Sequence, residues 1–398
     1  MKVNMHRVLA VAIILFCISS LTYAFWPPIN RVLALFIIAA LVSCFLTNIR
    51  SKDVIIGLGL IGVLIFSVVM AEDLEQNLED WLYWAVTCVF LAMLTRADFV
   101  KKLNASIKSQ RVIVCLIIWT ANIVLSIGFF IPSCYAGGYY IGFSYSQHVL
   151  SCGCCILLAL VLFYFKGRTA SVKQLLSMLP ATLAILSGGA RTFIISIVVI
   201  WFLFFLDFVK NARTRLVAVP VFLVVAIVLF LDSGMMQKFL ITTDNIYISE
   251  NTLTAMSSGR LEFWNLDIMA FLDADMLKKL LGHGFDYVYR LNYLEYGLAI
   301  WAHNDIINLL ICAGLLGTAI YISVFSSFLR CVFKKIDQKK RGIACVLYVM
   351  LPMLLNGLFL YQHYLYSVVI LYLYLTEPDQ MCKTDIVETK KINENQAR

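Results

Sequence analysis

The segment that begins at His303 carries the residues best suited to proton transfer. Asn304 and Asp305 follow the histidine, and nine residues separate Asn304 from Gly314 within an apolar run. Near the positive end of a helix dipole an imidazole is biased toward its neutral form, so it can accept a proton from an attacking hydroxyl group. Asn304 or Asp305 can cap the helix or orient the imidazole. Taken alone, such a histidine is also typical of a helix cap or a packed core residue.

Two arginines are suited to binding an anion. Arg191 lies in Leu186-Ser-Gly-Gly-Ala-Arg191-Thr192, where the glycines permit a tight turn between two apolar runs. Arg260 ends Ser257-Ser-Gly-Arg260, directly before an amphipathic stretch whose helix start also favours anions. A guanidinium group stays charged at any working pH and can bind two phosphate oxygens at once, so the pair predicts a diphosphate ligand. The alternative for Arg191 is an interfacial arginine that reaches lipid phosphate.

Other polar residues are weaker candidates. His283, in a turn flanked by glycines, and Arg290 are candidates for binding the substrate, although a simple surface turn also explains His283. His148 and His363 lie in or beside apolar runs and have no acidic neighbour at helical spacing. That pattern favours packing or a helix–helix hydrogen bond over proton transfer.

These residues belong to a very apolar chain. Of its 398 residues, 61% are hydrophobic and 14% are charged, and the mean hydropathy is +0.86, which excludes a soluble globular protein. Apolar runs long enough to cross a hydrocarbon core recur, so we predict an all-α, polytopic integral membrane protein with about twelve transmembrane helices. Their centres lie in 8–25, 32–47, 54–70, 81–95, 112–132, 148–165, 174–189, 192–208, 215–232, 304–329, 343–357 and 359–376. The cysteines, mostly within these runs, act as small hydrophobes and predict neither a disulfide framework nor a metal site.

The distribution of charge predicts the orientation of the helices. Lys and Arg gather in short loops on one side, which is therefore the cytoplasmic side, at Arg50/Lys52, Arg96–Arg111, Lys166–Lys173, Lys210–Arg215 and Arg330–Arg341. The alternate loops are acidic, as in 71–80, or free of Lys and Arg, as in 132–147. Both termini then lie in the cytoplasm, and the long hydrophilic segment 233–302 lies outside the membrane. The net charge of +8 reflects this orientation and an attraction to anionic membrane lipid rather than a nucleic-acid partner.

The outer segment contains a predicted amphipathic helix that opens at Arg260 and ends near Gly282. Its apolar stripe at helical spacing consists of Leu261, Trp264, Ile268, Phe271 and Leu272, and Glu262, Asn265 and Asp273 fall away from it. Such a helix lies on the outer membrane surface or against the bundle, and a structural lid is the simplest role for it. No phosphate-cradling glycine loop occurs in the chain, so a donor has to arrive already activated and bound to the membrane.

The three elements together resemble the O-antigen ligase and O-antigen polymerase superfamily of bacterial membrane glycosyltransferases. Ser187-Gly-Gly-Ala-Arg191-Thr192 looks like the outer-turn arginine of the family, and Gly259-Arg260-Leu-Glu-Phe-Trp264 looks like the arginine that opens its periplasmic helix. His303-Asn304, nine residues and Gly314-x-x-Gly317 are similar to the ligase signature. The resemblance covers about 186–320, whereas the first 180 residues match only as hydrophobic spans.

The resemblance implies transfer of a glycan from undecaprenyl diphosphate at the periplasmic face of the bacterial inner membrane, without a metal or other cofactor. Arg191 and Arg260 would hold the diphosphate and His303 would position or deprotonate the acceptor hydroxyl, with inversion at the anomeric carbon. Asn304, Asp305, His283 and Arg290 complete the expected substrate-binding residues. Other polysaccharide-assembly proteins are possible contacts.

On this basis the chain divides into N-terminal transmembrane helices (1–185), a ligase-like catalytic region (186–320) and C-terminal transmembrane helices with a cytoplasmic tail (321–398).

The signature around His303 favours a ligase that uses lipid A-core as acceptor. A polymerase that joins lipid-linked repeat units keeps much of the same apparatus. A flippase or exporter of lipid-linked glycan also explains many spans, but it predicts a charged path through the membrane, and the spans are nearly free of charge.

Overall fold

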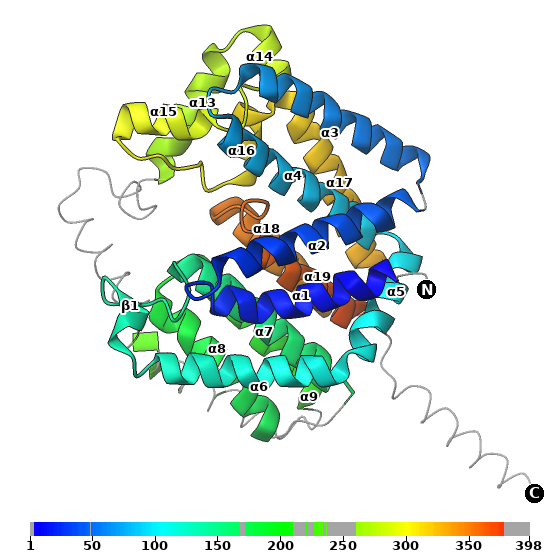
Figure 1. Ribbon diagram of the computed structural model, residues 1–398, viewed down its shortest axis with the longest axis vertical. Coiled ribbons are helices and arrows are strands. Elements are labelled where there is room, and N and C mark those ends of the chain that lie inside the picture. The colour runs from blue at the N-terminus through cyan, green and yellow to red at the C-terminus, as the bar shows by residue number, and fades with distance from the viewer. Residues whose placement is uncertain are drawn as a thin grey trace, which may run out of the picture.

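The chain is almost entirely helical in the computed structural model, which describes residues 4–47, 49–167, 172–209, 260–336 and 338–377 and isolated positions between 220 and 236 (Figure 1). The helices are α1 (Met5–Leu21), α2 (Pro27–Leu46), α3 (Ser51–Met70), α4 (Leu74–Leu94), α5 (Ala97–Ser109), α6 (Arg111–Gly128), α7 (Gln147–Phe165), α8 (Val172–Gly188), α9 (Ile194–Phe208), α13 (Arg260–Asp273), α14 (Met276–Leu281), α15 (Tyr287–Tyr296), α16 (Asp305–Cys312), α17 (Gly314–Lys335), α18 (Lys339–Leu355) and α19 (Gln362–Thr376). Two 3-10 turns are η1 (Pro132–Cys134) and η2 (Arg191–Phe193). The predicted all-α class is confirmed, apart from one small antiparallel hairpin of β1 (Tyr135–Ala136) and β2 (Tyr139–Tyr140), in which Tyr135 pairs with Tyr140.

Several helices are suited to crossing a membrane. Within the described residues, six are long and apolar enough, namely α2, α3, α6, α7, η2 with α9, and α17; α4 with α5 makes a seventh candidate, bent by 98°. The predicted spans at 8–25, 174–189, 343–357 and 359–376 are helices of 15 to 17 residues, shorter than these six. The predicted span 215–232 lies largely outside the described residues. The span predicted at 304–329 is broken at Ala313 into α16 and α17.

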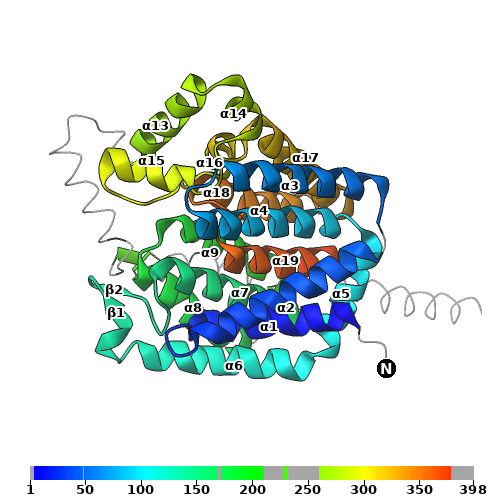
Figure 2. The same cartoon turned by 45° about the horizontal axis from the view of Figure 1, so that its top comes forward.

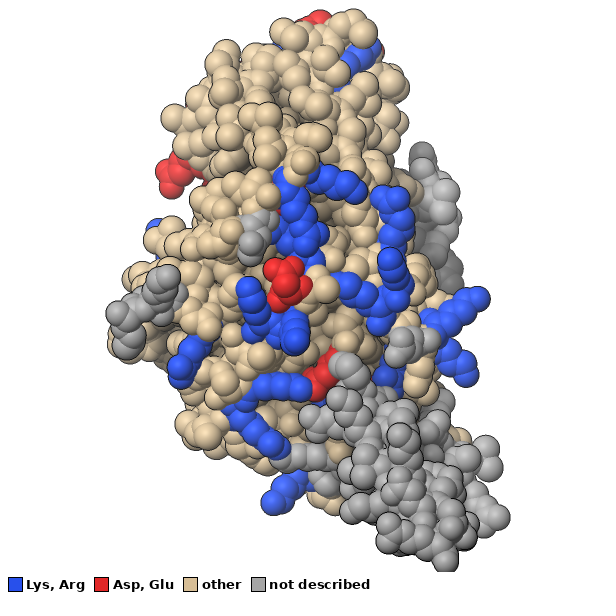
Figure 3. All heavy atoms as spheres, turned by 90° about the vertical axis from the view of Figure 1, so that its right-hand side faces the viewer, with Lys and Arg blue, Asp and Glu red and all other residues tan. Residues whose placement is uncertain are grey.

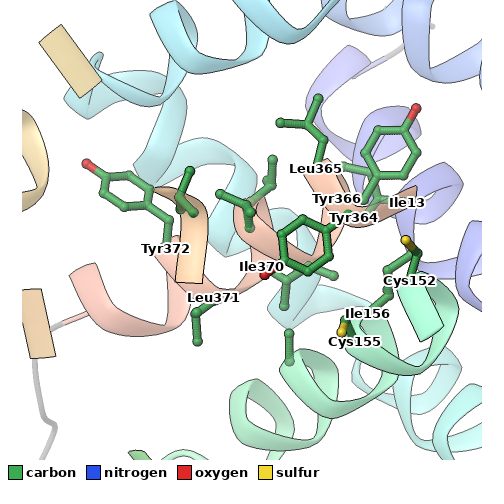
Figure 4. Packing of buried hydrophobic residues seen from close by; sticks show 14 of the residues in the cluster. Ile13, Cys152, Cys155, Ile156, Tyr364, Leu365, Tyr366, Ile370, Leu371 and Tyr372 are labelled. Atoms are coloured by element: carbon green, nitrogen blue, oxygen red, sulfur yellow. The ribbon is translucent and has the colours of Figure 1, made fainter. Parts of the chain in front are cut away.

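The core of the bundle is built around α19. Figure 2 shows this helix in the middle, with α4 on one side and α7 on the other. Because α19 is buried along nearly its whole length, its tyrosine hydroxyls must find partners inside the protein. Tyr364 donates to the carbonyl oxygen of Tyr348 at 2.6 Å, and Tyr348 donates to Ser367 at 2.9 Å. Figure 4 shows Cys152 and Cys155 of α7 among these rings, where the thiols pack as small apolar groups, as predicted.

Basic side chains gather at one end of the bundle. Figure 3 shows this face, which lies on the right-hand side of Figure 1 near the N-terminus and α5. The start of α3, the segment from α5 to the start of α6, and the end of α17 with the start of α18 carry the predicted basic loops Arg50/Lys52, Arg96–Arg111 and Arg330–Arg341, whereas Lys210–Arg215 and part of Lys166–Lys173 lie outside the described residues. The opposite ends of the same helices carry the acidic segment 71–80 and the hairpin. The structure therefore separates the two classes of loop as the charge pattern predicts.

Helices α13, α14 and α15 form an outer layer over α16 (Figures 1 and 2). The predicted helix ends at Gly282, as expected. It is broken before Asp275 into α13 and α14, because Asp275 caps α14 by accepting a hydrogen bond from the backbone N–H of Lys278 at 3.0 Å.

The helix α15 was not predicted. It is held in place by Asp286, whose carboxylate accepts hydrogen bonds from the backbone N–H groups of Glu72 and Asp73, both at 3.0 Å.

The predicted apolar stripe of α13 is divided between two faces. Leu261, Ile268 and Leu272 are exposed, whereas Asp267 is the one buried residue of this helix. The reason is a tertiary contact: the indole N–H of Trp264 donates to the carbonyl oxygen of Ala302 at 2.5 Å, which turns the Trp264–Asp267 face inward. Three apolar side chains are thereby left on the outside, as in a helix that lies on a membrane surface.

Candidate functional site

Arg191, Arg260 and His303 meet at the end of the bundle opposite to its basic face. Arg191 opens η2 after the positive-φ residue Gly189, Arg260 is the first residue of α13, and His303 directly precedes Asn304, the cap of α16. Burial lowers the pKa of the Arg260 guanidinium, and the positive charge of Arg191 lowers it further. Burial also lowers the pKa of His303 to about 3, with the charge of Arg260 as the next cause. Arg260 is therefore close enough to both Arg191 and His303 for the charges to influence one another.

The position of Arg260 is fixed from two sides. Its guanidinium donates to the carbonyl oxygen of Leu355 at the end of α18. Four residues later, Trp264 holds α13 against Ala302, the residue before His303. Among the residues that the structure describes, no carboxylate pairs with Arg260. A partly buried cation in this situation favours an anionic ligand, because the ligand supplies the missing counter-charge.

His303 has an unusual backbone. Its φ of 54° is the only positive φ of a non-glycine residue in the described part of the chain. Such conformations cost free energy and are often found at functional sites. The imidazole lies beside the Trp301 ring, with centroids 4.8 Å apart, and its Nδ1 is buried without a hydrogen-bond partner among the described residues. The imidazole is therefore neutral, and an anion bound at Arg260 would raise its pKa toward the range of a proton acceptor.

Trp301, Asn356, Tyr361 and His148 also border the site, although His148 was expected to pack or to form a helix–helix hydrogen bond. Ring contacts join Trp301, Tyr361 and His148 in a row, with centroids 5.6 Å apart for Trp301 and Tyr361 and 5.8 Å apart for Tyr361 and His148. The positive charge of His148 also lowers the pKa of His303, whereas Asn356 acts in the opposite direction. His148 and Tyr361 lie at the ends of α7 and α19 that are away from the basic loops. The predicted topology alone could therefore have placed both residues at the same end of the bundle as His303.

Asn304 and Asp305 have structural contacts. Asn304 caps α16, since its Oδ1 accepts from the backbone N–H of Ile306 at 3.0 Å and of Ile307 at 3.2 Å. The carboxylate of Asp305 is buried and accepts from the backbone N–H of Leu358 at 2.9 Å and from the Tyr321 hydroxyl at 2.5 Å. Asn304 is therefore the residue that caps the helix, and Asp305 anchors the loop between α18 and α19.

His283 and Arg290 form a separate group. The His283 ring stacks on Tyr287, with centroids 4.3 Å apart, and its Nδ1 lies 3.2 Å from the carbonyl oxygen of Ile311. The alternative of a simple surface turn is wrong in one respect, because His283 is buried. Arg290 pairs with Glu72 and lies 3.6 Å from Asp286. The structure does not bring either residue into contact with the site around His303.

This arrangement has a definite chemical capacity. Two guanidinium groups can hold a diphosphate, and a neutral imidazole next to them can take a proton from a hydroxyl group. The Trp301 and Tyr361 rings offer apolar faces beside these groups. Within the described residues, no three side chains of His, Cys, Asp or Glu are grouped as ligands for a metal ion.

No protein-family model matches the chain, and no match was found among curated proteins.

Proposed function

We propose that the chain is an O-antigen ligase, a glycosyltransferase that moves a glycan from undecaprenyl diphosphate to a hydroxyl group of lipid A-core. The observation that carries this proposal is the convergence of Arg191, Arg260 and His303 from three separate elements. These are the residues on which the resemblance to the superfamily depends, and they lie together at the end of the bundle away from its basic face.

In the proposed reaction, the oxygen of the acceptor hydroxyl attacks the anomeric carbon of the lipid-linked glycan. The new carbon–oxygen bond forms as the bond to the diphosphate breaks, and the bonding electrons leave with undecaprenyl diphosphate. His303 takes the hydroxyl proton once the bound diphosphate offsets the charge of Arg260, since burial together with that charge holds its pKa at about 3 in the free protein. Arg191 and Arg260 stabilise the negative charge that grows on the leaving diphosphate. Attack from the side opposite to the leaving group inverts the anomeric configuration.

The proposal includes the membrane setting. About twelve transmembrane helices would place both termini in the cytoplasm and the site at the periplasmic face of the inner membrane. The one-sided distribution of Lys and Arg supports this orientation. The lipid-linked donor would then reach Arg191 and Arg260 from the outer leaflet, with α13 as a cover.

The direct test is a transfer assay with the purified protein. Undecaprenyl-diphosphate-linked glycan is incubated with lipid A-core and, in parallel, alone. Product on lipid A-core that is lost in Arg191→Ala, Arg260→Ala and His303→Ala supports a ligase. Longer chains on the carrier without any core product would instead make the protein a polymerase. If neither product forms while the protein is folded and the carrier intact, the enzyme proposal fails and transport of the lipid-linked glycan becomes the alternative.

A further inference from the structure

A second charged site lies at the basic end of the bundle, where α5 crosses the start of α1. α5 is bent by 98° from α4, so it runs across the ends of the membrane-capable helices (Figure 1). Its buried residues are mostly apolar, whereas Lys101, Lys102 and Lys108 are exposed. A helix perpendicular to a membrane span, with one apolar and one basic face, is typical of the membrane surface.

Between α1 and α5 the surface is hollowed into a pocket of about 520 Å³. Arg7 and His6 from α1 line one side, and Lys102, Ser106 and Ser109 from α5 line the other. The first turn of α1 also faces it: Asn4 lines the pocket, and its Oδ1 accepts hydrogen bonds from the backbone N–H of His6 at 3.1 Å and of Arg7 at 3.3 Å. None of the described residues that line the pocket is acidic.

The charges around the pocket favour an anion. Arg7 and Lys102 come from helices that are far apart in sequence, so their positive charges are brought together by the fold. The N-terminus of α1 adds the positive end of a 17-residue helix dipole. Asp98 of α5 does not line the pocket, and its carboxylate lies 3.7 Å from Arg50. It is close enough to act on His6: burial and the charge of Lys102 lower the pKa of that imidazole, whereas the charge of Asp98 raises it. The volume exceeds what one inorganic phosphate ion needs and falls in the range of small-ligand sites, about 300–1,000 Å³.

We infer that this pocket binds a phosphate group, as carried by the headgroup of an anionic phospholipid. The pocket is lined by α1 and α5, which lie at the end of the bundle where Figure 3 shows Lys and Arg gathered. Basic pockets between membrane helices on this side are suited to lipid headgroups, because the ligand diffuses to them within the bilayer surface. The site is independent of the proposed function, since Arg191, Arg260 and His303 lie at the other end of the bundle.

The test uses the full chain, purified in a neutral detergent. Binding of phosphatidylglycerol and phosphatidylcholine is followed by native mass spectrometry, and binding of inorganic phosphate by calorimetry. The wild type is compared with Arg7→Gln/Lys102→Gln. The matched control is Lys101→Gln/Lys334→Gln, which removes the same charge from exposed positions on the same face but outside the pocket. A charge-conserving variant, Arg7→Lys/Lys102→Arg, separates lost charge from lost folding.

We expect phosphatidylglycerol to bind in preference to phosphatidylcholine, and the pocket variant to lose roughly 30-fold in affinity. The control and the charge-conserving variant should stay within about threefold of the wild type. If inorganic phosphate binds as tightly as the lipid and the pocket variant loses this binding, the ligand is a soluble phosphate compound. The inference of a lipid headgroup would then be wrong. Equal losses in the pocket variant and the matched control would show a diffuse surface charge and no site.

Discussion

His283 and His303 occupy contrasting environments in the outer part of the molecule. His283 stacks on Tyr287 and contacts the carbonyl of Ile311, and its neighbour Arg290 pairs with Glu72 and Asp286. His303 has a strained backbone, faces Arg260 and keeps a buried Nδ1 without a partner among the described residues.

The contrast shows how to distinguish a structural polar group from a functional one. Around His283 the imidazole contacts Tyr287 and the carbonyl oxygen of Ile311, and the charge of Arg290 is paired with Glu72 and Asp286, so the cation there has its counter-charge within the protein. Around His303 there is excess positive charge, and such an arrangement is retained where a ligand or a reaction uses it. Four changes test this difference, from the largest expected effect to the smallest.

The two histidines should respond very differently to truncation. His303→Ala should lower kcat/KM for glycan transfer by about 1,000-fold, because it removes the proposed proton acceptor. His283→Ala should keep activity within about threefold of the wild type and instead lower the thermal stability, since a buried ring contact is lost. Transfer rates and melting curves of both variants check this. Equal losses of activity would erase the distinction between the two regions.

The arginines provide a second pair. Arg260→Gln should reduce kcat/KM by about 100-fold, because one donor to the leaving diphosphate is lost. Arg290→Gln should leave transfer nearly unchanged and lower the free energy of unfolding, because it leaves the buried carboxylate of Asp286 without its cation. Kinetics in parallel with chemical denaturation distinguish the two effects. A fully active Arg260→Gln would remove this arginine from the site.

His148 tests how far the His303 region extends. His148→Ala should reduce transfer by roughly tenfold, because the row of rings through Tyr361 and Trp301 positions the site and small displacements reduce rates. His148→Phe keeps a ring at this position and serves as the control for packing. If His148→Ala is fully active, the site ends at Tyr361.

The pH dependence is the smallest predicted effect. The free protein holds the pKa of His303 at about 3, below the usual 6.5, so its imidazole stays neutral as the pH falls from 7 to 5. The profile of kcat/KM should therefore show no acid limb from His303 in that range. A bound diphosphate favours the protonated form, so any limb in kcat should lie at higher pH than in kcat/KM. A limb in kcat/KM near pH 6.5 would contradict the burial of His303 beside Arg260.

Much of the helical framework could be predicted because apolar runs and turn residues act locally. The turn before Arg191 and the helix end at Gly282 follow from glycines that adopt positive φ, 68° at Gly189 and 90° at Gly282. The break at Ala313 depends on a tertiary contact. A Cβ on Gly314 would lie 2.6 Å from the backbone N of Gly282, so the two segments approach in a way that no local pattern reveals.

The candidate site was predictable in part for the same reason. Arg191, Arg260 and His303 each stand at the edge of an apolar run, where a charged group has a recognisable place in the sequence. His148 and Tyr361 reach the site only through the packing of α7 and α19, and both lie outside the segment 186–320. The inward turn of α13 at Trp264 likewise depends on Ala302, which periodicity alone does not identify.

The most direct test of the central claim is the binding of undecaprenyl diphosphate to the purified protein. If Arg191, Arg260 and His303 form one diphosphate site, Arg260→Gln and Arg191→Gln should each weaken binding about tenfold or more, and Arg290→Gln should not. Undecaprenyl monophosphate should bind more weakly than the diphosphate. Unchanged affinity in both site variants, or an equal loss in Arg290→Gln, would contradict the assignment of the site to the His303 region.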